Sequence, residues 1–287
     1  MGLKRFGKFG DGFWEGLEKL VFFALFPALL FVSIARAQVV WSSALPAVAV
    51  GFGASAIGAA LAFAGRWLLR PESRAFASSV QIGFRFSAYV GLAIASRLAT
   101  AGQPDALVHM AMLIAVVVPG ANVLAVYALA RESRQPLLAQ IVKNPIILAT
   151  LAGGFWNAFM PALPVWGAQF LERLGSASIA LGLIAVGAGM LATAARPRQA
   201  ARPVGWMVYL LTVKHLAMPL TAIGLTWLLG YTSQQTQVGI LFAALPTAAS
   251  AYVLATRMGG DGPLVAELIT ASTILGMLLL PLWLLVL

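Results

Sequence analysis

The chain has 287 residues, of which 61% are hydrophobic and only 10% are charged, and its mean hydropathy is +0.90. In soluble domains about half of the residues are apolar and about a quarter are charged, so this composition excludes a water-soluble fold. The formal net charge of +10 could indicate a nucleic-acid partner, but the basic residues fall in short loops, where they typically anchor helices at the cytoplasmic face. We therefore expect membrane lipids, and no nucleic acid, as partners. The absence of cysteine excludes disulfides, thiolate metal sites and cysteine nucleophiles.

Long uncharged segments predict transmembrane helices. Residues 37–65, 144–171 and 268–287 contain no Asp, Glu, Lys, Arg or His. A helix of about 20 apolar residues crosses a hydrocarbon layer of about 30 Å, and each segment is long enough to do so. The segments show no sustained polar alternation, which favours helices over a β-barrel. The predicted fold class is an all-α polytopic membrane protein.

Charges, prolines and polar breaks divide the chain into nine predicted spans, which follow a basic cytoplasmic segment at residues 1–18. In chain order the spans are 19–35, 45–68, 77–98, 106–130, 138–159, 174–194, 205–229, 237–257 and 264–287, with a cytoplasmic linker at 131–137. With the N-terminus inside, fourteen basic residues lie in inner segments and three in outer loops. This bias predicts an inner (plasma) membrane protein with its N-terminus in the cytoplasm and its C-terminus outside.

A short motif recurs in the third and eighth spans. Residues 87–90 and residues 250–253 both read Ser-Ala-Tyr-Val, and each copy precedes an Arg, a Gly-containing turn with one Asp, and a helix with an internal proline. The topology makes the two spans antiparallel, which predicts an inverted repeat of residues 19–130 (four helices) and 138–287 (five helices). The span at 138–159 then has no partner. Either this lineage dispensed with a helix, or the chain begins after its ancestral first span.

Polar groups in the third and eighth spans are the main candidates for substrate contacts. Arg85 lies inside an apolar run, and a buried arginine in lipid normally faces a cavity or a partner. The alternative is that Arg85 snorkels to the cytoplasmic headgroups. Pro246 interrupts the eighth span beside Thr247 and Ser250, and such breaks present half-helix ends to ions. The alternative is a simple proline kink whose hydroxyls bond back to carbonyls.

Further polar residues lie in other spans. Asn122 is the one amide in the middle of a long apolar stretch, and we favour a substrate contact there. Ser272 and Thr273 could contact substrate or, as we favour for them, join helices together. Lys214 and His215 could serve in a proton or charge role, since histidine titrates near neutrality, although a lone histidine is more often a packing residue.

The sequence also lacks several functional patterns. No Asp or Glu lies in the middle of a span, which disfavours cation exchange because sodium and proton sites in carriers usually use buried carboxylates. An anionic or neutral substrate fits better. No HExxH, GxSxG, P-loop or GxGxxG constellation is present, so we expect no enzyme, no metal site and no cofactor.

Several segments between residue 13 and the C-terminus form a recognisable set. They are Leu17–Phe22, Phe26–Phe31, Val118–Pro119, Asn122–Leu124, Lys143–Pro145, Leu245–Ala248 and Ser272–Thr273. Together they resemble the auxin efflux carrier family, in the bacterial branch that includes malonate and malate permeases. The resemblance implies two inverted five-helix repeats, a scaffold domain, and a transport domain whose two broken helices cross at the substrate site, an architecture like that of the sodium/bile-acid symporters. The breaks would fall around residues 87–91 and 246–250, and the family's first helix would be missing.

Two departures from the family pattern leave alternatives open. Bacterial relatives typically read Arg-Asn-Thr and Gly-Leu-Pro where residues 85–87 read Arg-Phe-Ser and residues 91–93 read Gly-Leu-Ala. The substrate could differ, transport could be weaker, or the third span could be a more regular helix.

We interpret the chain as a secondary active transporter of a small organic anion, a dicarboxylate or an auxin-like carboxylate, which works by alternating access as a monomer or a homodimer. The expected substrate-binding residues are Arg85, Ser87, Gly91, Asn122, Pro246, Thr247, Ser250 and Thr273. The alternatives are a non-transporting membrane sensor, a degenerate carrier, or a channel or lipid scramblase.

Overall fold

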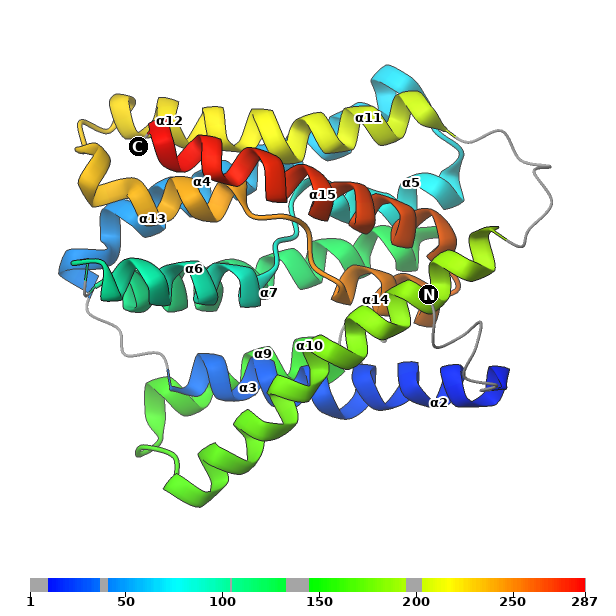
Figure 1. The fold of residues 1–287 in the computed structure, drawn as a ribbon, viewed down its shortest axis with the longest axis horizontal. Coiled ribbons are helices and arrows are strands. Elements are labelled where there is room, and N and C mark those ends of the chain that lie inside the picture. Colours follow the sequence, from blue (N-terminus) through cyan, green and yellow to red (C-terminus); the bar gives the residue numbers. More distant parts are fainter. Residues whose placement is uncertain (1–9, 37–40, 104, 133–144, 195–202, 287) are drawn as a thin grey trace.

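The computed structural model describes residues 10–36, 41–103, 105–132, 145–194 and 203–286, and within these ranges every regular element is a helix (Figure 1). The first half contains α2 (Asp11–Leu20), η1 (Val21–Leu25), α3 (Phe26–Ala35), α4 (Trp41–Leu69), α5 (Ser73–Ser79), η2 (Val80–Gly83), α6 (Ala88–Thr100) and α7 (Ala106–Glu132). The second half contains α9 (Pro145–Phe159), α10 (Val165–Ala194), α11 (Val204–Thr212), η3 (Val213–Ala217), α12 (Met218–Leu228), α13 (Ser233–Ala244), α14 (Ser250–Arg257) and α15 (Gly262–Val286).

Four helical stretches are long and apolar enough to cross a membrane. They are Ala44–Leu69, Met112–Arg131, Val204–Leu228 and Gly262–Leu285, and a shorter apolar helix covers Val21–Val32. Large apolar side chains remain exposed on these helices, including Trp67 and Trp227, as expected for surfaces that face lipid rather than water. The chain is therefore an all-α membrane protein, as the composition predicts; the count of nine spans stays a prediction.

Two of the predicted spans are interrupted near the middle. The third comprises α5, the 3₁₀ turn η2 and α6, with the non-helical link Phe84–Ser87 between η2 and α6. The eighth comprises α13 and α14, joined by the link Leu245–Ala249. Pro246 explains the second link, because proline forces the preceding residue out of the helical region, and Leu245 has an extended ψ of 143°. The first link contains no proline, yet it is not helical. The third span is therefore not the more regular helix that the sequence left open as an alternative.

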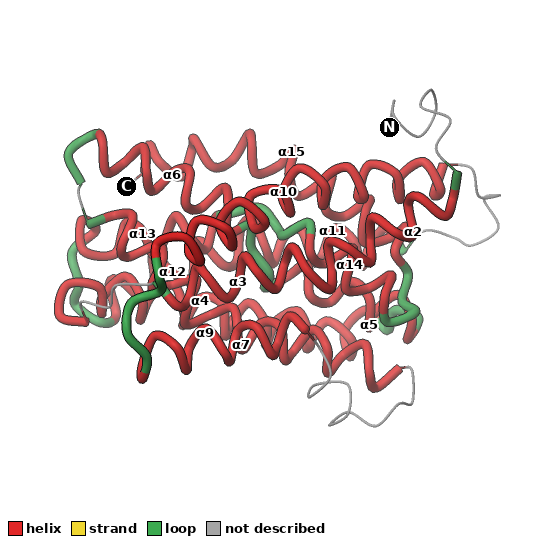
Figure 2. The backbone as a smooth tube through the Cα atoms, turned by 90° about the horizontal axis from the view of Figure 1, so that it is seen from below, coloured by secondary structure: helices red, strands yellow, loops and turns green. Residues whose placement is uncertain are grey.

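The two links cross each other. Figure 1 shows both links in the middle of the molecule, with α6 and α13 on one side and α5 and α14 on the other, so the chain passes through the two links in opposite directions. Figure 2 shows non-helical segments in the middle of an otherwise helical body. The backbone N–H of Ser87 donates a hydrogen bond of 2.8 Å to the carbonyl oxygen of Pro246, which ties one link directly to the other.

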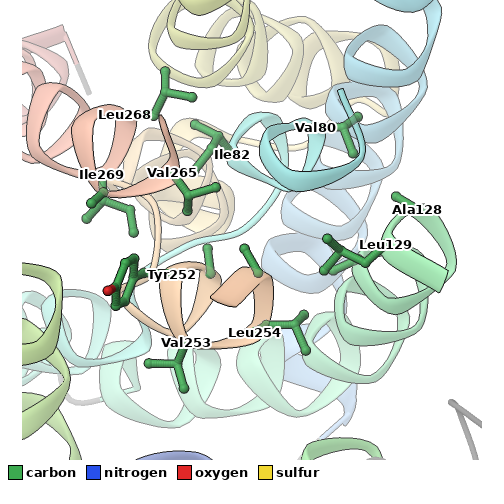
Figure 3. Packing of buried hydrophobic residues seen from close by; sticks show 14 of the residues in the cluster. Val80, Ile82, Ala128, Leu129, Tyr252, Val253, Leu254, Val265, Leu268 and Ile269 are labelled. Carbon is green, nitrogen blue, oxygen red and sulfur yellow. The ribbon is translucent and has the colours of Figure 1, made fainter. Parts of the chain in front are cut away.

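A buried apolar cluster surrounds α5 and η2, the first half of the third span, and α14, the second half of the eighth span. Figure 3 shows side chains from η2, α7, α14 and α15 meeting in this cluster, among them Ile82, Leu129, Val253 and Val265. Lipid tails are as apolar as these side chains, so helix association in the membrane depends on close van der Waals packing. Gly239 illustrates that packing, since a Cβ atom there would lie only 2.5 Å from the carbonyl oxygen of Ala47 on α4.

A second group of helices lies along one side of the crossing. In Figure 1, α2, α3 and α9 run along the lower edge, and α10 crosses them obliquely. Arg36 forms an ion pair with Glu172, and the side-chain amide of Asn157 donates a hydrogen bond of 3.1 Å to the carbonyl of Ala35. The α3 helix of this group faces the crossing and contributes part of the cavity described next.

Candidate functional site

A cavity of about 300 Å³ lies where the two links cross, between α3, α7 and α15. Its polar lining residues are Arg85, Ser87, Asn122, Thr247, Ser250 and Thr273. Its apolar lining residues are Phe26, Leu29, Leu30, Phe86, Ala88, Val90, Val118, Ala121, Pro246, Ala248, Ala249, Ile269 and Met277. Seven of the eight residues proposed from the sequence to bind substrate therefore border one cavity, and Gly91 is the exception.

Arg85 is the one cationic side chain among the lining residues. Only 6% of its surface is exposed, and its guanidinium donates hydrogen bonds to Gln81 Oε1 at 3.3 Å and to Ser250 Oγ at 2.8 Å. No Asp or Glu carboxylate pairs with it among the described residues. The guanidinium points into the protein, so the snorkelling alternative does not describe it. It offers further N–H donors to an anion in the cavity.

Two neutral polar groups on the cavity wall make no hydrogen bond within the described ranges. They are the side-chain amide nitrogen of Asn122, on a residue that is 3% exposed, and the hydroxyl of Thr247. Buried polar groups without partners cost about 1–3 kcal/mol each, so a polar ligand in the cavity would recover that free energy. The backbone N–H of Thr247 donates a hydrogen bond of 3.0 Å to Ser272 Oγ.

Each link is followed by a helix whose first residues border the cavity: α6 after the first link and α14 after the second. Ser87 is the N-cap of α6 with an extended backbone, and its side chain makes no capping hydrogen bond. Ser250 is the first residue of α14, and the residue that precedes it makes no side-chain cap either. The first amide groups of a helix carry partial positive charge and suit an anion. The repeated Ser-Ala-Tyr-Val motif thus places equivalent serines at two helix starts on the same cavity.

Gly91 occupies a different position from the one that the sequence suggested. The first link covers residues 84–87, slightly earlier than the break expected at 87–91, so Gly91 lies within α6. A Cβ atom there would lie 2.9 Å from Leu245 Cδ1 and 3.0 Å from Met110 Sδ. The glycine therefore allows α6 to pack closely against the other link, and it does not border the cavity.

Thr273 borders the cavity, but its hydroxyl is already engaged. Its Oγ1 donates a hydrogen bond of 2.8 Å to the carbonyl of Ile269 one turn earlier in α15. A hydroxyl bonded in this way still has acceptor capacity for a ligand.

Lys214 and His215 lie behind the second link rather than on the cavity. They occupy the π-helical turn η3 between α11 and α12, and Lys214 is fully buried. The Lys214 ammonium lies 3.4 Å from the carbonyl oxygen of Ala243, in the last turn of α13. His215 Nε2 lies 2.8 Å from Ser272 Oγ, the same atom that accepts the backbone N–H of Thr247. Both side chains therefore contact the segments around the break and do not line the cavity, and a proton or charge role for them stays a prediction.

Sequence reasoning missed Gln81 and the apolar side of the cavity. Gln81 is fully buried in η2, accepts from Arg85, and donates to the carbonyls of Ser78 at 2.8 Å and Ala251 at 3.4 Å. Gln81 precedes Arg85 by four residues, about one helical turn, and this spacing could have predicted a hydrogen bond between the two side chains. The apolar wall from α3 carries no such signal, because apolar residues are common throughout the chain.

No group of three or more His, Cys, Asp or Glu residues that could hold a metal ion occurs within the described ranges. In a comparison with known families, the model of the family described as "Membrane transport protein" matches residues 130–284, more than half of the chain. A search of curated proteins gives no match.

Proposed function

This chain belongs to the membrane transport protein family, the auxin efflux carrier family, and from that premise we propose that it is a secondary active transporter of a small organic anion. The anion binds in the cavity where the two links cross. A transporter family gives no reason to expect an enzyme.

One observation carries the proposal: a buried guanidinium that pairs with no carboxylate of the described residues lines a cavity inside a membrane protein. Burying an unneutralised charge costs several kcal/mol, and such a residue persists in a membrane protein when its charge serves a ligand. The Arg85 guanidinium, the unpartnered amide of Asn122 and the starts of α6 and α14 all offer N–H groups to the same space. A carboxylate accepts hydrogen bonds from each of these groups.

The lining also favours one class of anion over another. Among the described residues Arg85 is the only cation on the wall. Phe26, Leu29, Leu30 and Met277 line the cavity with apolar surface. A dicarboxylate would place its second charge against that surface without a countercharge, which is costly. A monocarboxylate with an apolar body would place its charge at Arg85 and its body against the apolar side chains. We therefore favour the auxin-like carboxylate over the dicarboxylate.

The inverted repeat supplies the transport mechanism in this proposal. The recurring motif begins both α6 and α14, and the chain passes through the two links in opposite directions (Figure 1), as repeats at residues 19–130 and 138–287 would require. Alternating access then follows from movement of the crossing helices against the group of α2, α3, α9 and α10. We place the N-terminus in the cytoplasm and the C-terminus outside, as the charge distribution favours.

Transport assays with the purified protein in liposomes test this function. We expect saturable uptake of an aromatic monocarboxylate, weak competition by dicarboxylates and none by an organic cation. The Arg85→Lys variant keeps the positive charge but loses the planar guanidinium that donates to both Gln81 and Ser250. Its KM should therefore rise at least tenfold. Arg97→Lys, on an exposed arginine outside the cavity, is the matched control and should transport normally.

The same transport assay distinguishes a transporter from the alternative functions. Binding of the monocarboxylate without uptake would replace the transporter with a sensor or a degenerate carrier. Flux that does not saturate would indicate a channel or a scramblase instead.

A further inference from the structure

A second pocket, of about 370 Å³, lies at the ends of α4 and α7 and shares no residue with the cavity at the crossing. Its lining residues are Phe63, Arg66, Trp67, Phe76, Ala77, Tyr127, Ala128 and Arg131. Arg66 lies in the last turn of α4, and Arg131 lies in the last turn of α7. The two arginines thus reach one pocket from two helices that are far apart in the sequence.

Neither arginine has an acidic partner in the part of the chain that the structure describes. The Arg66 guanidinium lies 4.9 Å from the centre of the Phe76 ring and 3.5 Å from Ser73 Oγ. The Arg131 guanidinium donates to the hydroxyl of Tyr127 at 3.3 Å. These contacts are to neutral groups, so no carboxylate among the described residues neutralises either guanidinium. Among the described residues, none that lines this pocket is acidic.

The floor of the pocket is well packed. Phe76, Ala77 and Ala128 are buried, and the Phe76 ring contacts the rings of Phe63 and Trp206 with centroids 5.8 and 5.7 Å away. A rigid aromatic floor with two cations at its edge is a preformed site for an anion rather than a gap between mobile side chains.

The surroundings identify the type of anion. The pocket lies at the arginine-bearing ends of the candidate spans Ala44–Leu69 and Met112–Arg131, where a membrane helix meets the headgroup layer. Trp67, which is 77% exposed, lines the pocket, and the neighbouring Leu68 is also exposed. A ligand in this position can place a charged head between the arginines and an apolar tail along the helix.

We propose that the pocket binds the phosphate of an anionic phospholipid, with Arg66 and Arg131 as the headgroup ligands and Trp67 beside the acyl chains. Arginine suits this role because its planar fork donates two parallel hydrogen bonds to phosphate oxygens. Basic pockets between transmembrane helices bind anionic lipid headgroups in the same way. The site is independent of the transport proposal, because it needs only an anionic lipid at the end of two membrane helices.

Native mass spectrometry of the full chain, with phosphatidylglycerol or phosphatidylcholine added, tests the site. The wild type should retain phosphatidylglycerol in preference to phosphatidylcholine. The double variant Arg66→Gln, Arg131→Gln should bind phosphatidylglycerol at least tenfold more weakly, because each charge-assisted contact is lost. The control Arg70→Gln, Arg97→Gln removes the same charge from exposed arginines outside the pocket and should bind as the wild type does.

Two further arms keep the result interpretable. Glycerol 3-phosphate carries the headgroup chemistry without the tails, and it should not displace phosphatidylglycerol at equal concentration; displacement would overturn the lipid as the occupant. If the glutamine pair does not fold, Arg66→Lys, Arg131→Lys takes its place and should keep the preference for phosphatidylglycerol. Equal binding by the glutamine pair and its control, or loss of the preference in the lysine pair, would overturn the proposal.

Discussion

Replacing Arg85 with methionine separates a functional arginine from a structural one. The substitution keeps an unbranched side chain but removes the charge and the hydrogen bonds to Gln81 and Ser250. Two charge-assisted hydrogen bonds to a carboxylate contribute about 3–6 kcal/mol together, which corresponds to roughly 10²- to 10⁴-fold in Kd. We therefore expect Arg85→Met to abolish measurable uptake and substrate-induced thermal stabilisation.

The effect of the same change on the ligand-free protein should be small. Loss of the contact to Gln81 costs about 1–3 kcal/mol, because that amide is buried, whereas the Ser250 hydroxyl borders the cavity and can be hydrated. Removal of a buried charge that no carboxylate neutralises returns several kcal/mol. The two contributions oppose each other, so the free energy of unfolding should stay within about 2 kcal/mol of the wild type.

The measurement is a thermal unfolding curve in detergent with and without the monocarboxylate, alongside uptake into liposomes. Arg97→Met serves as the control, because Arg97 is exposed and lies outside the cavity. If Arg85→Met unfolds far more easily than the wild type yet still gains stability from the substrate, Arg85 is a structural residue. Binding of the anion would then not depend on the Arg85 charge.

Three further substitutions probe other parts of the molecule. Asn122→Leu removes a buried amide without a partner, so we expect unchanged or higher stability in thermal unfolding and a KM raised about tenfold. Lys214→Met removes a fully buried ammonium and should raise the unfolding temperature; a lower one would show that the contacts of the ammonium outweigh its burial. Gly239→Ala brings a Cβ atom against the carbonyl of Ala47 and should destabilise by about 1–3 kcal/mol, whereas Gly224→Ala, with open space around it, should be neutral or stabilising.

The sequence was informative wherever a residue is chemically unusual for its surroundings. Arg85 and Asn122 stand out in apolar runs, Pro246 dictates a break by its covalent structure, and the repeated motif points to Ser87 and Ser250. All five lie on one cavity. A charge, an amide or a proline in a membrane helix carries a large local free-energy cost, and that cost is visible without knowledge of the fold.

The features that the sequence did not reveal depend on tertiary packing. The first link contains no proline, so its position at residues 84–87 follows from the crossing with Pro246 and not from local preference. Gly91 could not be told apart from a glycine at a break, because its role is set by Leu245 and Met110 from other elements. The contribution of α3 to the cavity is likewise a property of helix placement.

The hydrogen bond between Ser87 and Pro246 has a consequence for how this site can change over generations. Both of its atoms belong to the main chain, so the bond depends on the N–H group of Ser87 and on the break that Pro246 imposes, and not on the side chains that line the cavity. Side chains around the cavity can therefore vary while the crossing itself is inherited intact. Descendants of one ancestral carrier could acquire new ligands by single substitutions at residues such as Arg85, Asn122 or Ser250, without rebuilding the scaffold that presents them.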